Sequence, residues 1–133
     1  ARRVPAAIVC LLSALRYHEL TTQIPHRVWI ALPPRSRVPV ISGLALSVVQ
    51  FSGTALSDGV EVLEMDGVSV RITTPARTVV DCFKYRNKIG RDVAVEALRD
   101  AMDEGKATLG EIIRLAEMRR MSEVMRPYLE FYQ

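Results

Sequence analysis

The fold is decided by the stretch Thr73-Thr74-Pro75-Ala76-Arg77-Thr78-Val79-Val80-Asp81-Cys82-Phe83, where one type of secondary structure gives way to another. Just before it, residues 68–72 alternate apolar and polar side chains, which is the period of a half-buried strand. Thr74 suits an N-cap, because its hydroxyl can accept a hydrogen bond from the first turn, and Pro75 suits the first helical position. We therefore expect a strand that runs directly into a helix over residues 74–86.

The expected helix has an apolar face and a charged face. The apolar side chains recur at i, i+3, i+4 and i+7, and they are Ala76, Val79, Val80 and Phe83. The charged side chains recur at i, i+4, i+7 and i+11, and they are Arg77, Asp81, Lys84 and Lys88. We expect the first face to lie in the core. On the second face, Arg77 and Asp81 have the spacing of an ion pair within the helix.

The remaining segments predict an α+β fold in a single domain, residues 1–133. A helix is expected over residues 5–20, followed by strands at 27–32, 46–51 and 60–65, with Asp66-Gly67 as a hairpin turn into the fourth strand. A Pro- and Arg-rich loop separates the first two strands. Three helical segments follow Gly90, marked by Gly105 as a C-terminal stop, a capping box at Thr108 and Glu111, and Pro127 in the last one. We expect a small, mostly antiparallel sheet of about four strands packed by an N-terminal helix and several C-terminal helices.

Composition excludes several classes of protein. Hydrophobic residues make up 49% of the chain, yet no apolar run is long enough to span a bilayer, so no membrane partner is expected. Two cysteines are too few for a secreted disulfide scaffold, so we expect buried free thiols and a cytoplasmic location.

Positive charge is concentrated in one block of the chain. Residues 71–91 hold six cations against Asp81 alone, namely Arg71, Arg77, Lys84, Arg86, Lys88 and Arg91. Such a block can bind phosphates of DNA or an acidic face of another protein. The alternative is that Arg77 pairs with Asp81 and the other cations are simply solvated. An acidic stripe follows, formed by Asp92, Glu96, Asp100 and Asp103, which is either a solvated helix face or a surface for a basic partner.

No catalytic or cofactor motif is present. The two cysteines and two histidines lack the short spacing of a structural zinc site, and there is no phosphate-binding glycine loop or nucleophile elbow. We therefore expect no metal, no cofactor and no enzymatic activity. The enzymatic alternative is a divergent metal-dependent nuclease that uses Glu61, Glu64 and Asp66, and a further alternative is a dimerisation module.

Several segments, taken in order, resemble the C-terminal domain of AbiEi-family antitoxins, which are often described as transcriptional regulators of viral defence. They are Val9 to Leu15, Leu20 to Pro25, Val28 to Pro33, Thr73 to Phe83, Asn87 to Gly90, Ala94 to Ala101 and Met125 to Glu130. The resemblance implies an antitoxin that neutralises a nucleotidyltransferase-like toxin in a type IV toxin–antitoxin system, and that also represses its own operon.

In this family an N-terminal winged helix-turn-helix binds DNA, and only Ala1, Arg2 and Arg3 precede Val4 here. We expect that domain to be missing from this sequence and to lie in a longer native chain. The resemblance thus leaves antitoxicity, auxiliary DNA contacts and a possible homodimer to these 133 residues. It marks no catalytic residue.

Overall fold

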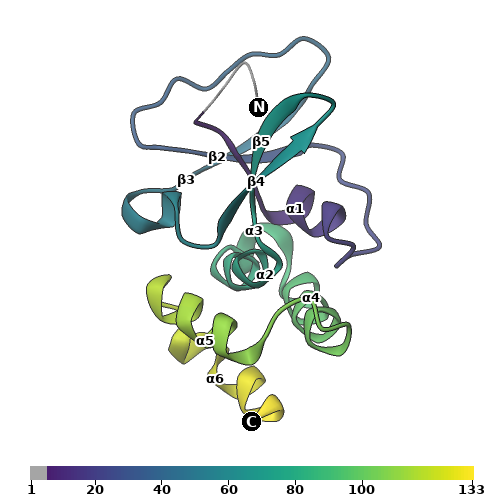
Figure 1. The fold of residues 1–133 in the computed structure, drawn as a ribbon, viewed down its shortest axis with the longest axis vertical. Helices are drawn as coiled ribbons and strands as arrows, with labels where there is room; N and C mark the ends of the chain where they lie inside the picture. Colours follow the sequence, from purple (N-terminus) through teal and green to yellow (C-terminus); the bar gives the residue numbers. More distant parts are fainter. Residues whose placement is uncertain (1–5) are drawn as a thin grey trace.

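The computed structural model describes residues 6–133 and places helices beneath one face of a five-stranded sheet (Figure 1). The strands are β1 (Ile8–Val9), β2 (Val28–Leu32), β3 (Leu46–Gln50), β4 (Val60–Met65) and β5 (Val68–Thr73). The α-helices are α1 (Leu11–Tyr17), α2 (Pro75–Lys84), α3 (Arg86–Ile89), α4 (Arg91–Asp103), α5 (Leu109–Met118) and α6 (Ser122–Leu129). Two 3₁₀ turns, η1 (Gly53–Leu56) and η2 (Glu130–Tyr132), complete the order. The expected α+β class is confirmed.

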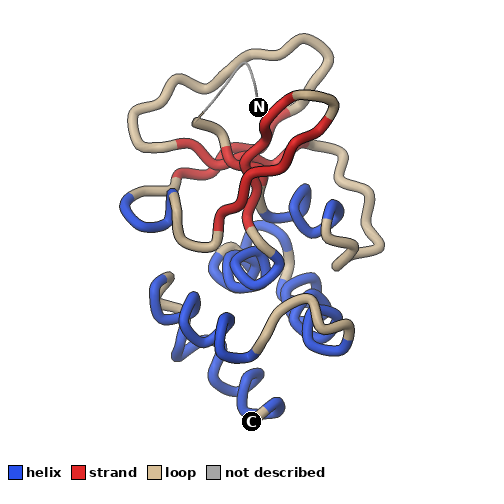
Figure 2. The backbone as a smooth tube through the Cα atoms, in the orientation of Figure 1, coloured by secondary structure: helices blue, strands red, loops and turns tan. Residues whose placement is uncertain are grey.

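The prediction of about four mostly antiparallel strands was wrong, because the sheet is mixed. Its order is β3-β2-β1-β5-β4, with β1 antiparallel to β2 and parallel to β5, β2 parallel to β3, and β4 antiparallel to β5. Two parallel strands cannot be joined by a tight hairpin. Accordingly, residues 33–45 travel back along the sheet as an irregular loop before β3 begins (Figure 2).

The predicted first helix was wrong in its first half. Its start at Pro5 lies outside the described residues, and Ile8 and Val9 form β1 rather than helix. The Cys10 N–H donates to the Trp29 carbonyl at 3.1 Å, and the Trp29 N–H donates to Ser13 Oγ at 2.9 Å. These bonds hold the strand and the helix that follows it against β2. A two-residue strand is too short to show the alternation of apolar and polar side chains. The apolar side chains of β1 therefore matched the helical periodicity of α1, and the predicted helix included them.

The expected helix ends are confirmed where the capping chemistry is local. The Arg77 N–H donates to the Thr74 hydroxyl at 3.2 Å, with Pro75 at the first helical position of α2. Thr108 and Glu111 form both hydrogen bonds of a capping box at the start of α5. After α4, Gly105 has φ +67°, a conformation that glycine adopts without the strain of a Cβ atom. Each of these signals needs only neighbouring residues.

Helix α2 lies at the centre of the molecule, between the sheet side and the remaining helices (Figure 1). It contacts α1 and β5 on one side and α4 and α5 on the other. Residues 76–83 are all buried, which includes Arg77 and Asp81 as well as the predicted apolar face. The first half of the charged face, Arg77 and Asp81, is therefore buried together with the apolar face.

Candidate functional site

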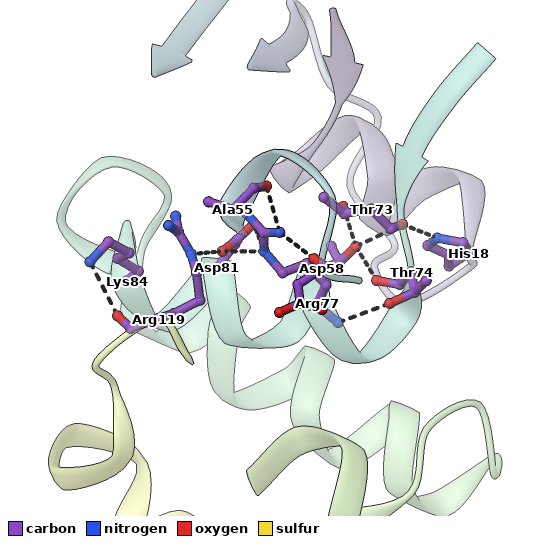
Figure 3. Close-up of polar contacts among 10 residues, drawn as sticks. His18, Ala55, Asp58, Thr73, Thr74, Arg77, Asp81, Lys84 and Arg119 are labelled. Atoms are coloured by element: carbon purple, nitrogen blue, oxygen red, sulfur yellow. Dashed lines mark hydrogen bonds and ion pairs between the residues drawn. The ribbon is translucent and has the colours of Figure 1, made fainter. Parts of the chain in front are cut away.

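Arg77 is completely buried, and its Nε and Nη1 atoms donate the hydrogen bonds that Figure 3 shows. Its Nε donates to both carboxylate oxygens of Asp81 at 3.0 and 3.1 Å, which is the ion pair expected from the i, i+4 spacing. Its Nη1 donates to the carbonyls of Ala55 and Asp58, at 2.8 and 2.6 Å. Arg77 thus ties α2 to η1 and to the loop before β4, and its burial leaves it out of reach of a partner.

A second arginine shares the same carboxylate. Arg119, at the C-terminal end of α5, donates from Nε to Asp81 Oδ1 at 2.8 Å and is 9% exposed. Arg77 and Arg119 each leave their Nη2 atom without a hydrogen-bond partner among the described residues. We call Arg77, Asp81 and Arg119 the buried charge cluster. It carries two guanidinium groups for one carboxylate, so charge is not balanced within it.

Aromatic and backbone contacts surround this buried charge cluster. The Cζ atoms of Arg77 and Arg119 lie 4.5 and 5.1 Å from the centre of the Phe51 ring, within the range of cation–π attraction. Gly59 lies against the stem of Arg77, so that a Cβ at residue 59 would fall 2.6 Å from Arg77 Cβ. No sequence signal identified Arg119, Phe51 or Gly59 as members, because only the tertiary fold brings them to α2.

Both cysteines are buried free thiols near the same cluster, as expected for the pair. Burial raises the pKa of the Cys10 thiol well above its ordinary value, and the Asp81 carboxylate raises it further, while Arg77 and Arg119 act in the opposite direction. Burial likewise raises the pKa of the Cys82 thiol, followed by the charge of Asp81. Thiols held protonated in this way are poor nucleophiles.

Three more of the predicted binding residues make contacts within the domain. Arg71 donates to the Leu56 carbonyl at 2.5 Å, and Arg86 donates to the Phe83 carbonyl at 2.8 Å. Lys84 donates to the Arg119 carbonyl at 3.3 Å. Partial burial lowers the pKa of Lys84, and the charges of Arg119 and Arg120 lower it further. Because Lys84 bonds to the carbonyl of Arg119, the fold brings the backbone of Arg120, which the sequence did not single out, next to the Lys84 ammonium group.

Lys88 and Arg91 are the exposed members of the predicted set whose side chains make no hydrogen bond or ion pair with another described residue. They lie on α3 and at the start of α4, directly after Lys84 and Arg86 in the chain. We define the basic surface as Lys84, Arg86, Lys88, Arg91 and Arg120. Arg77 is left out of it because it is fully buried, and Arg71 because it lies on β5 and bonds to the Leu56 carbonyl.

The carboxylates considered for a nuclease do not gather at one point. Glu61 and Glu64 are separated by three positions on β4, so they lie on opposite faces of the sheet. Glu64 accepts a hydrogen bond from the Ser69 hydroxyl at 2.8 Å. Within residues 6–133 there is no group of three or more His, Cys, Asp or Glu side chains placed to hold a metal ion. In the same range, no helix has the length and apolar character that a membrane crossing requires.

Comparison with known proteins gives the family. The model of the AbiEi antitoxin C-terminal domain matches residues 7–129 of the 133 in the chain. This chain belongs to the AbiEi antitoxin C-terminal domain family. A search of curated proteins found no match.

The match covers every helix and strand of this AbiEi domain from the start of β1 to the end of α6. AbiEi proteins are antitoxins and not a family of enzymes, so the domain has an antitoxin or regulator role. That role implies a toxin as a partner in general terms.

Proposed function

We propose that this AbiEi domain neutralises a nucleotidyltransferase-like toxin of a type IV system in the cytoplasm, and that it does so through the basic surface. The proposal is supported above all by the family match combined with Lys88 and Arg91, two exposed cations whose side chains have no partner among residues 6–133. Side chains that are already bonded within the domain contribute to its stability. Unbonded cations remain able to bind an acidic surface or phosphate groups of a partner.

The neighbouring residues reinforce this positive charge. The Lys84 ammonium group donates to the carbonyl of Arg119, the residue directly before Arg120, so these like charges come from neighbouring positions of the surface. Like charges brought together cost free energy in the isolated domain, and an anionic partner relieves that cost. The same surface fits auxiliary contacts to the DNA backbone, which is the second part of the proposal.

The test is a growth-rescue experiment with a nucleotidyltransferase-like toxin of a type IV system as the co-expressed partner. Expression of that protein alone should stop growth, and co-expression of the antitoxin should restore it. The double variant Lys88→Glu/Arg91→Glu should lower rescue at least tenfold, because it reverses two exposed charges whose side chains bond no other described residue. The matched control Arg35→Glu/Arg37→Glu reverses two exposed charges in the 33–45 loop and should leave rescue unchanged. Equal rescue by wild type and the Lys88/Arg91 variant would contradict the proposal.

The DNA contact has a separate readout. Binding of the domain to a DNA duplex is measured by gel shift at a series of salt concentrations. The affinity should fall as the salt concentration rises, because the domain displaces counterions from the phosphates and their release becomes less favourable in higher salt. The Lys88→Glu/Arg91→Glu variant should reduce the salt dependence by a slope of about 2, one for each lost phosphate contact. If the slope stays the same while rescue is lost, these residues contact the toxin and not DNA.

A further inference from the structure

A groove of about 520 Å³ runs between α4 and the C-terminal segment formed by α6 and η2, on the side of the molecule away from the sheet (Figure 1). One wall is made by Val95 and Leu98 of α4. The other is made by aromatic rings, which include Tyr128, Phe131 and Tyr132. The lining is therefore mainly apolar and comes from two separate helical segments.

The walls of this groove are anchored, but its edge is open. Leu98 is buried, and the Tyr128 ring packs on core residue Phe83 with 5.1 Å between ring centres. Phe131, in contrast, is 83% exposed and touches the Tyr132 ring edge-on at 5.2 Å. A large exposed aromatic side chain beside a preformed apolar groove is typical of a binding surface for another protein.

Helix α4, which forms one wall of the groove, carries four acidic and two basic side chains. Asp92, Glu96 and Asp103 are exposed on α4, and none of them forms an ion pair with a described residue. Asp103 and Arg99 both line the groove itself. Carboxylates at this density repel nucleic acid and attract lysine or arginine.

We propose that the groove binds an amphipathic basic helix of a protein partner. The apolar stripe of that helix would pack against Leu98, Tyr128 and Phe131, and lysines or arginines beside the stripe would face the carboxylates of α4. A helix laid into a groove between two other helices is a recurring mode of recognition. This surface is distinct from the basic surface, so the inference goes beyond the proposed function and stands whichever toxin the domain neutralises.

The probe is a fluorescein-labelled synthetic helix of roughly 18 residues with leucine on one face and lysine on the other, compared with a twin that carries glutamate in place of lysine. Fluorescence anisotropy should show binding of the lysine helix and not of its twin. The chain has a net charge of +3, which by itself would favour the glutamate twin. A preference for lysine must therefore come from a local acidic site.

Two substitutions locate the binding. Phe131→Asp should weaken binding of the lysine helix at least tenfold, while Val62→Asp, at a 62% exposed valine of β4, should leave it unchanged. Asp103→Lys should weaken it several-fold, while Asp66→Lys in the β4–β5 turn should not. Circular dichroism of each variant confirms that it is folded.

Three results would overturn the inference. One is equal binding of the lysine helix and the glutamate helix. Another is a loss of binding in the control variants as large as that in Phe131→Asp and Asp103→Lys. The third is light scattering that shows a dimer of the free domain which Phe131→Asp turns into a monomer, because the groove would then hold a second copy of this chain.

Discussion

At the scale of single residues, Asp81 has the most consequential position, since one carboxylate serves two buried guanidinium groups. Asp81→Asn preserves the size of the side chain but removes its charge, which leaves Arg77 and Arg119 buried without a counter-ion. We expect the free energy of unfolding to fall by about 3–5 kcal/mol, the usual cost of breaking a buried ion pair from one side. Urea denaturation measures it. Asp66→Asn, at an exposed turn position, is the control and should change stability by less than about 0.5 kcal/mol.

The cysteines predict how stability depends on pH. Burial raises the folded-state pKa of Cys10 and Cys82 well above the ordinary 9.0, so the unfolded chain loses these protons first as pH rises. Their contribution to stability is therefore intact below pH 9 and declines above it, toward the folded pKa. Urea denaturation at several pH values should show this decline, and Cys10→Ala/Cys82→Ala should reduce it. An identical decline in the double variant would show that other groups cause it.

At the scale of elements, the sequence predicts the features that depend on neighbouring residues and misses those that depend on residues far apart in the chain. The strand–helix unit around Thr74, the capping box at Thr108 and the stop at Gly105 were all predicted, because each rests on neighbouring residues. Strand β1 was missed, because two residues carry no periodicity and only pairing with β2 and β5 makes them a strand.

The candidate site was predicted less completely for the same reason. The i, i+4 spacing identified Arg77 and Asp81 as a pair, but it could not show that both are buried. The carbonyls of Ala55 and Asp58 and the side chain of Arg119 come from distant parts of the chain, so no spacing reveals them. Charge counted along the sequence consequently overestimated the basic surface by two residues, Arg71 and Arg77.

The turn before β4 lies close to α2, and a matched pair of glycine substitutions tests this contact. Gly59 and Gly67 both have positive φ, +71° and +77°, so alanine strains the backbone at either position. Only at Gly59 would the new Cβ also meet Arg77, whereas at Gly67 no atom outside the turn lies within 4 Å. We expect Gly59→Ala to lower stability by about 1–3 kcal/mol more than Gly67→Ala, as in other overpacked sites. Thermal or urea unfolding measures the difference, and equal losses would contradict the close contact.

At the scale of the whole molecule, α2 packs both against α1 and β5 on the sheet side and against α4 and α5 on the helical side. Trp29, the single tryptophan, lies in β2, while most helical residues follow α2. Because both parts share α2 in their cores, we expect one cooperative unfolding transition. Tryptophan fluorescence and far-ultraviolet circular dichroism should give the same midpoint in urea. Separate midpoints would show that the helices after α2 unfold independently of the sheet.

The buried charge cluster also has a consequence for how relatives of this chain diverge. Losing one member leaves a buried charge unpaired, whereas replacing all three with apolar residues of similar volume can be neutral or stabilising. Sequence change at positions 77, 81 and 119 should therefore be concerted, with intermediates that fold poorly. A distant member of the family that lacks Asp81 is expected to lack both arginines as well. The three positions together therefore provide a marker for aligning chains of low sequence identity.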